Sequence, residues 1–134
     1  MASTRVDYNE MEWASAVTFF GPAAVYQGKY VVQLKVLSDR RTDGGGIVWL
    51  VKFSPPPGKL IKIVATALSD EHIFNLQGGR STKSGQPAQG SGGYGLNPKG
   101  QPHSAMIAQE TVAFVLYAGE PDRIDSMEVL DVAA

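Results

Sequence analysis

Residues 58–78 read GKLIKIVATALSDEHIFNLQG, and this stretch sets the expected fold class. Within it, residues 60–67 (LIKIVATA) and 71–77 (EHIFNLQ) are short runs of β-branched and apolar residues that are typical of strands. The turn before them, residues 54–58 (SPPPG), cannot continue a strand ladder because proline lacks the backbone N–H. The stretch therefore predicts two strands with a firm boundary on their N-terminal side.

The rest of the chain continues this pattern of short strands. Three further segments have the composition of strands: residues 29–37 (KYVVQLKVL), 47–53 (IVWLVKF) and 111–118 (TVAFVLYA). Residues 38–46 form a polar, glycine-rich turn, and residues 79–97 are rich in Gly, Ser, Gln and Pro and offer little to bury. Residues 9–16 are expected to form at most a turn or two of helix. Strands separated by turns every eight to twelve residues or so predict an all-β sandwich or barrel, in a single domain over residues 1–134.

Composition and charge exclude several classes of function. The chain has 134 residues, a formal net charge of −1, no cysteine and two histidines. The lack of a basic excess argues against a nucleic-acid partner. Without cysteine there is no disulfide or thiolate metal site, and His72 and His103 alone cannot supply a three-histidine metal site. Neither a signal peptide nor a membrane span is predicted, so we expect a soluble, cytoplasmic protein without a membrane partner.

Two sets of spaced residues carry more specific information. The first set is Gly58, Val64, Thr66, Glu71 and Gly78, and the second is Gly92, Pro98, Gly100 and His103. Their spacing resembles the two sequence motifs of the cupin superfamily, G-x5-H-x-H-x3,4-E-x6-G and G-x5-P-x-G-x2-H-x3-N. The chain looks like a small single-domain, RmlC-like cupin, similar above all to the ChrR-like and acetylacetone-dioxygenase-like group.

This resemblance implies a cupin-type double-stranded β-helix, which is a jelly-roll barrel. It places the first motif at about residues 58–78, an inter-motif loop at 79–97 and the second motif at about 92–107. Cupins commonly pair through strands, so the resemblance also implies a homodimer.

The same resemblance bears on metal binding. In cupins the two motifs surround a divalent metal, usually held by three histidines and a glutamate. Here Val64 and Thr66 replace two of the histidines, so only Glu71 and His103 occupy ligand positions. Two ligands of mixed type hold a metal poorly. We therefore expect no tightly bound metal cofactor, with a weakly held divalent metal on Glu71 and His103 as the alternative.

Strand geometry indicates which residues of the segment 60–67 share a face. Residues two apart in a strand share a face, so Lys62, Val64 and Thr66 project together, either into the barrel or out of it. We expect them inside, where they would line a substrate pocket; in the alternative, Lys62 faces solvent and Thr66 is an ordinary strand residue. His72 has the opposite parity to Glu71. The expected substrate-binding residues are Lys62, Val64, Thr66, Trp49, Phe53, Met106 and Tyr117.

Glu71 and His103 are the expected catalytic residues. A carboxylate and an imidazole can remove a proton from one substrate atom and return it to another. The sequence thus favours an enzyme that binds an apolar carbonyl compound or natural-product intermediate and catalyses isomerisation, elimination or cyclisation. The alternatives are a non-catalytic ligand-binding or sensory barrel, and a metal-dependent dioxygenase with an unusual ligand set. The acidic segment 120–131 is expected to be a solvated closing segment, and a C-terminal strand at Ser126–Val132 that pairs with a partner molecule is the alternative.

Overall fold

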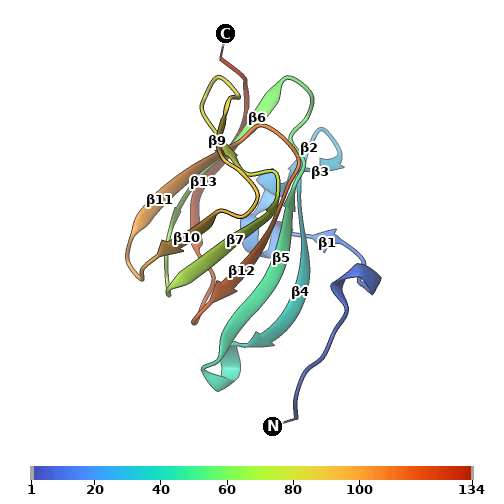
Figure 1. Cartoon of the computed structure of the whole chain (residues 1–134), viewed down its shortest axis with the longest axis vertical. Helices are drawn as coiled ribbons and strands as arrows, with labels where there is room; N and C mark the ends of the chain where they lie inside the picture. Colours follow the sequence, from blue (N-terminus) through green and yellow to red (C-terminus); the bar gives the residue numbers. More distant parts are fainter. Residues whose placement is uncertain (1, 134) are drawn as a thin grey trace.

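The structure is a computed structural model that describes residues 2–133. The strands are β1 (Ala14–Ser15), β2 (Val25–Tyr26), β3 (Lys29–Tyr30), β4 (Val32–Arg40), β5 (Gly46–Phe53), β6 (Lys59–Thr66), β7 (Glu71–Gln77), β8 (Arg80–Ser81), β9 (Pro87–Gln89), β10 (Tyr94–Asn97), β11 (Pro102–Ile107), β12 (Thr111–Tyr117) and β13 (Arg123–Asp131) (Figure 1). Helix in this part of the chain is limited to α1 (Val17–Phe20) and short 3-10 turns at Tyr8–Glu10, Pro22–Ala24 and Arg41–Asp43. The all-β prediction is confirmed.

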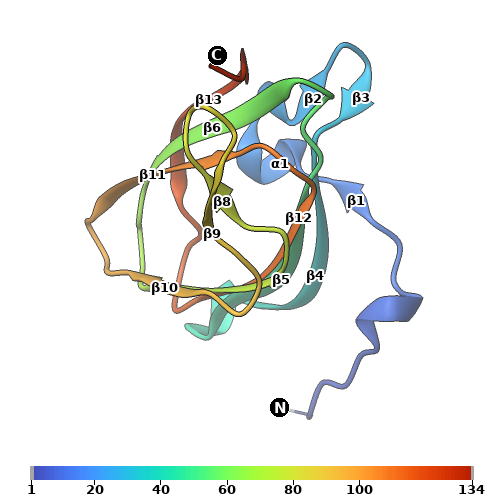
Figure 2. The same ribbon diagram turned by 45° about the horizontal axis from the view of Figure 1, so that its top comes forward.

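Two antiparallel sheets form the body of the molecule. The larger sheet has the order β1-β4-β5-β12-β7-β10, and the smaller has the order β11-β6-β13. Two further pairs, β2-β3 and β8-β9, complete the strands. Neighbours in the larger sheet are often far apart in sequence, which is typical of a jelly roll. Figure 2 shows the strands of the two sheets curving around a common centre, with the β8–β9 hairpin in front of it.

The core lies between these two sheets, as the alternation of burial along the strands shows. In β12, Thr111, Ala113, Val115 and Tyr117 are buried, and the residues between them are more exposed. In β6, Ile61, Ile63 and Ala65 are buried in the same alternating way. Alternation with period two is the pattern of a strand that turns one face to the core and the other outward. The inward face of each sheet is thereby defined residue by residue.

Three sequence predictions about local structure need correction. Residues 79–97 are not an irregular loop, because they contain β8, β9 and β10, and β10 extends the larger sheet by pairing with β7. The strand predicted at 29–37 is divided: residues 29–30 form β3, and β4 begins at Val32 and runs on to Arg40, into the segment predicted as a turn. The segment 120–131 is not merely a solvated end, because β13 pairs with β6 along its length. Tertiary pairing partners supply the backbone hydrogen bonds that these polar segments need.

Two further observations concern the outside of the molecule. Within residues 2–133, no helix is long and apolar enough to cross a membrane.

On the outward face of the larger sheet, Phe74, Leu96 and Leu116 are between 37 % and 48 % exposed. The homodimer expected from the resemblance stays a prediction.

Candidate active site

A cavity of about 320 Å³ lies between the two sheets, and we call it the central cavity. Its walls are mainly apolar, with Trp49 and Phe53 from β5, Ile63 from β6 and Val115 from β12. A volume near the lower end of the range of small-molecule pockets, about 300–1,000 Å³, suits a ligand of modest size. A few polar side chains interrupt the apolar wall, and three of them lie close together.

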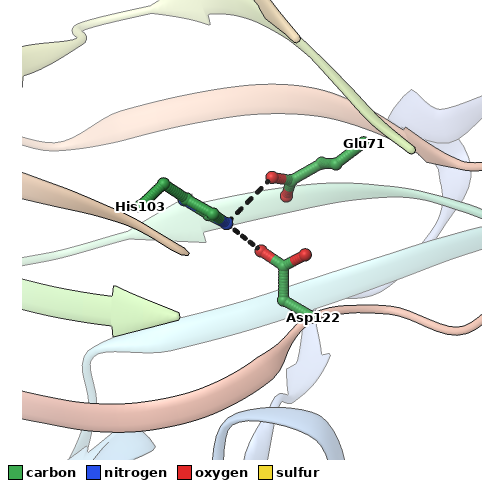
Figure 3. Close-up of side chains that lie close together, drawn as sticks. All are labelled: Glu71, His103 and Asp122. Carbon is green, nitrogen blue, oxygen red and sulfur yellow. Dashed lines mark ion pairs between the residues drawn. The ribbon is translucent and has the colours of Figure 1, made fainter. Parts of the chain in front are cut away.

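These three side chains, Glu71, His103 and Asp122, form what we call the acidic cluster (Figure 3). Glu71 begins β7, His103 lies on β11, and Asp122 lies in the turn between β12 and β13. His103 Nε2 is 2.8 Å from Asp122 Oδ2 and 3.5 Å from Glu71 Oε1. The side chains of Glu71 and Asp122 are 4 % and 5 % exposed, and that of His103 is 20 % exposed. The cluster therefore places two buried carboxylates around one imidazole that solvent still reaches.

Strand register explains how Glu71 is held. Tyr117 on β12 and Asn97 on β10 are its direct partners across the sheet, so all three side chains share the inward face. Asn97 Nδ2 donates a hydrogen bond to Glu71 Oε1 at 2.9 Å. Burial, and then repulsion from Asp122, raise the pKa of Glu71 to about 7, although Asn97, Tyr117 and His103 oppose the shift. Glu71 can therefore accept or release a proton near neutral pH.

The environment of His103 favours its charged form. The Asp122 carboxylate raises the pKa of His103 above its ordinary value, and partial burial opposes this effect. Yet His103 Nε2 and Asp122 Oδ1 are buried without a hydrogen-bond partner among the described residues. The ring nitrogen in Figure 3 points between the two carboxylates rather than squarely at either oxygen. Such a nitrogen is available to a further group placed between the three side chains.

The acidic cluster has the chemistry that a divalent metal requires. One ligand atom from each of the three residues lies within 4.8 Å of the other two. Cis ligands on an octahedral ion with bonds of about 2.1 Å lie about 3 Å apart, which is comparable to the separations around His103 Nε2. One imidazole and two carboxylates suit a borderline divalent cation. Together with the two unpaired buried atoms, this donor set fits a metal, and Asp122 adds the third ligand that sequence reasoning lacked.

Five of the predicted site residues line the central cavity: Glu71, His103, Trp49, Phe53 and Tyr117. The predicted catalytic pair is brought together, and its catalytic role stays a prediction. Trp49 is 1 % exposed, and its indole nitrogen has no hydrogen-bond partner among the described residues. Burial raises the pKa of Tyr117 well above its ordinary value, so Tyr117 is a neutral phenol.

The other four predicted substrate-binding residues do not line the cavity: Lys62, Val64, Thr66 and Met106. Lys62, Val64 and Thr66 alternate along β6 with the buried residues that face inward. Met106 on β11 is the cross-strand partner of Lys62 and shares its outward face. Thr66 instead donates a hydrogen bond to Asp125 at 2.7 Å. The prediction was therefore wrong by one residue of register, and Ile63 and Ala65 occupy the inward face.

A signal for the correct register was present in the sequence. The inward positions 61, 63 and 65 are Ile, Ile and Ala, whereas the outward positions 62, 64 and 66 include a lysine and a threonine. An alternating strand turns its more apolar set of residues to the core. His103 is the cross-strand partner of Ala65, which confirms that these two positions share the inward face.

Sequence reasoning missed Asp122 and Asn97. Asp122 fell within a segment expected to be solvated, and Asn97 fell within the presumed loop. Neither residue has a local signal, because each meets Glu71 or His103 only through pairing of strands that are distant in sequence.

Comparison with known proteins defines the class of fold. No protein-family model matches the sequence, and no curated protein sequence matches it significantly. Solved structures do match. A protein of unknown function with a cupin-like fold from Ralstonia eutropha JMP134 has a TM-score of 0.61 at 18 % identity, over 86 % of this chain and 66 % of that chain. A proposed acetylacetone dioxygenase from Methylibium petroleiphilum PM1 has a TM-score of 0.65 at 14 % identity, over 94 % and 83 % of the two chains.

A third similar structure is the polyketide cyclase RemF from Streptomyces resistomycificus. Its TM-score is 0.54 at 17 % identity, over 99 % of this chain and 87 % of that chain. The protein therefore has a cupin fold of the small, RmlC-like type, as its spaced residues predicted. At these identities the likeness defines the fold, and the function has to be argued from the site.

Proposed function

We propose that the protein is a small-molecule enzyme that transfers protons on an apolar carbonyl compound held in the central cavity. The observation that carries the proposal is the acidic cluster itself, in which an imidazole faces two buried carboxylates in the wall of a mainly apolar cavity. Such a wall binds the body of an organic molecule, and the cluster supplies an acid and a base at one place on it.

The reaction class follows from the two groups that exchange the proton. Glu71 in its carboxylate form takes a proton from a carbon next to a carbonyl group, which leaves an enolate. His103 in its imidazolium form gives a proton to a second atom of the same molecule. Return to another carbon gives isomerisation, and protonation of a departing group gives elimination. Cyclisation follows when the enolate carbon attacks a second carbonyl, whose oxygen then takes the proton.

The neighbouring residues hold this pair in place. Asp122, whose Oδ2 is 2.8 Å from His103 Nε2, forms an ion pair that stabilises the positive charge of the ring. Asn97 fixes Glu71 Oε1, and the buried Tyr117 faces the same carboxylate from the neighbouring strand. We assign Asp122 and Asn97 to positioning, because each acts on the substrate only through Glu71 or His103.

Replacement of the two central residues tests the proposal. We expect Glu71→Gln and His103→Ala each to lower turnover by about 10²–10⁴ if proton transfer limits the rate. His72→Ala is the matched control, because His72 lies next to Glu71 on the opposite face of β7 and contacts Tyr94. The readout is deuterium exchange at acidic C–H positions and product formation across a panel of aromatic ketones and keto acids, followed by NMR and mass spectrometry.

The outcomes of this experiment separate the alternatives. Full activity in both variants would overturn the mechanism. Tight binding of panel members without exchange or product would favour the non-catalytic ligand-binding barrel instead.

A second candidate function is supported by the two unpaired buried atoms, His103 Nε2 and Asp122 Oδ1. In this case Glu71, His103 and Asp122 hold a divalent metal, which when bound supplies a Lewis acid beside the substrate carbonyl. The walls of the cavity still bind and orient the substrate and exclude water. Dioxygenase chemistry is the form of this candidate that the sequence resemblance suggests.

A further inference from the structure

Arg80 is a charged residue in the wall of the central cavity that neither candidate mechanism uses. Its guanidinium Nη2 donates a hydrogen bond to the backbone oxygen of Ser104 at 2.9 Å, directly after His103 in the chain. A guanidinium has five N–H donors, so most of its donors remain for other partners. Among residues 2–133, no carboxylate lies within ion-pair distance of Arg80, whereas Arg41 and Arg123 each form such pairs. Arg80 is thus a solvent-exposed cation at the edge of the cavity, with no anionic partner among residues 2–133.

The backbone around Arg80 is firmly placed. Gly78 and Gly79 before it have φ angles of +69° and +149°, and a Cβ at Gly79 would lie 1.8 Å from the backbone oxygen of Gln89. Thr111 Oγ1 accepts a hydrogen bond from Gly79 N at 3.1 Å. On the other side, Ser81 Oγ donates to the backbone oxygen of Met106. These contacts attach β8 to β11 and β12, so the backbone at Arg80 is held in place, and the exposed side chain is directed by its hydrogen bond to Ser104.

Arg80 also lies within electrostatic reach of the acidic cluster. Its positive charge lowers the pKa of His103, against the larger effect of Asp122. A negative group bound by Arg80 would therefore lie near the atoms on which Glu71 and His103 act. The two nearby carboxylates, Glu71 and Asp122, disfavour a doubly charged ligand such as a phosphate monoester. A single planar carboxylate matches the guanidinium geometry and carries one charge.

We propose that Arg80 recognises the carboxylate of a substrate that is a keto acid with an apolar, aromatic body. The inference rests on the proposed function in treating the central cavity as a substrate site, and it adds the chemical class of the substrate. The aromatic wall formed by Trp49 and Phe53 receives the body of the molecule. Arg80 holds the carboxylate, and the enolisable carbon a few bonds away meets Glu71.

The test compares the binding of acids with that of their neutral esters. The probes are phenylpyruvate, benzoylacetate and cinnamate, each paired with its methyl ester. The chain has two tryptophans, and Trp49 lies in the cavity, so a Trp13→Phe background makes Trp49 the only fluorescent tryptophan that reports binding. The dissociation constant of each acid and ester is measured in this background, and then with Arg80→Gln, Arg80→Lys and Arg123→Gln added.

We expect at least one acid to bind about tenfold more tightly than its ester, which is about 1.4 kcal/mol, because only the acid forms a charge-assisted hydrogen bond with the guanidinium. Arg80→Gln should remove this preference, and Arg80→Lys should retain only part of it. The control Arg123→Gln should leave the preference unchanged, because Arg123 pairs with Asp125 on the outside of the molecule. Chemical unfolding of each variant shows whether the fold is retained.

Several results would overturn the inference: no acid preferred over its ester, no binding of any acid, or a preference that survives in Arg80→Gln. If Arg80→Gln lowered turnover but left the preference for the acid intact, Arg80 would stabilise the enolate and not the substrate carboxylate. That result would also overturn the inference. Failure of the proposed function looks different. In that case the acids bind through Arg80, and no deuterium exchange occurs that depends on Glu71.

Discussion

Asp122 Oδ2 lies 2.8 Å from His103 Nε2, although Asp122 lies in the turn between β12 and β13 and His103 lies on β11. This contact turns a partly exposed histidine into one member of a buried acid–base cluster. It also brings a second carboxylate close to Glu71, which helps to raise the pKa of Glu71 to about 7. Both candidate mechanisms, proton transfer and metal binding, therefore depend on Asp122.

The raised pKa of Glu71 predicts a particular dependence of stability on pH. Its pKa is about 7 in the folded protein and 4.5 ordinarily, so the folded state binds this proton more tightly than the unfolded state. The free energy of unfolding must then fall as the pH rises between these two values. The raised pKa of His103 acts in the same direction, because the stability it contributes at low pH is lost as the pH rises through its folded-state pKa.

Glu71→Gln should lose the share of this dependence that belongs to Glu71. We expect the variant to be more stable than the wild type by about 1–3 kcal/mol near pH 8, and about equally stable near pH 4. The measurement is urea unfolding in the presence of a chelator. Parallel pH profiles for the two proteins would contradict the assignment.

Metal binding can be tested at Asp122. We expect the wild type to bind iron(II), manganese, zinc or nickel with about tenfold or higher affinity than Asp122→Asn does. Loss of one of three metal ligands should lower the affinity at least as much as loss of an outer-shell partner does. Asp131→Asn is the control, since Asp131 is exposed and pairs with Lys59. Elemental mass spectrometry after incubation and desalting gives the metal content. Equal retention by the wild type and Asp122→Asn would show that the cluster does not hold the metal.

The register of β6 gives a paired prediction. Ala65 faces the cavity opposite His103, and Val64 faces outward. Ala65→Leu should fill part of the central cavity. It should weaken, by about tenfold or more, the binding of the aromatic acids that is followed by Trp49 fluorescence. Val64→Leu adds bulk on the other face and should change binding little. If Val64→Leu were the damaging change, the register described here would be wrong.

Gly46 at the start of β5 provides a prediction on stability. Its φ is +75°, and a Cβ there would lie 2.0 Å from the backbone oxygen of Tyr117, whose side chain faces Glu71. Gly46→Ala should therefore cost about 3 kcal/mol or more, since backbone must move. Gly44 has a similar φ of +76° but no atom within 4 Å of an added Cβ. Gly44→Ala should cost only about 1 kcal/mol. Thermal and urea unfolding of both variants would test this difference.

Much of the fold was predictable because its strongest signals are local. Residues 47–53 and 111–118 are dense in apolar and β-branched residues, and residues 71–77 contain three apolar residues. Each segment is followed within two positions by glycine or proline, and all three form strands close to those limits. The spacing of Glu71 and His103 relative to the glycines likewise pointed to the cupin fold. Polar segments such as 94–97 carry no such signal, because they become strands only when a partner such as β7 supplies their hydrogen bonds.

The sequence by itself determined the all-β class, the strand positions with strong apolar content, and the two residues Glu71 and His103 that meet in the cavity. Alternation also determined that Lys62, Val64 and Thr66 share one face.

Only the tertiary structure decided which face of β6 is inside, because that depends on the sheet that packs against it. It also decided that Asp122, Asn97 and Arg80 join the site, since each reaches it through strand pairing between segments distant in sequence.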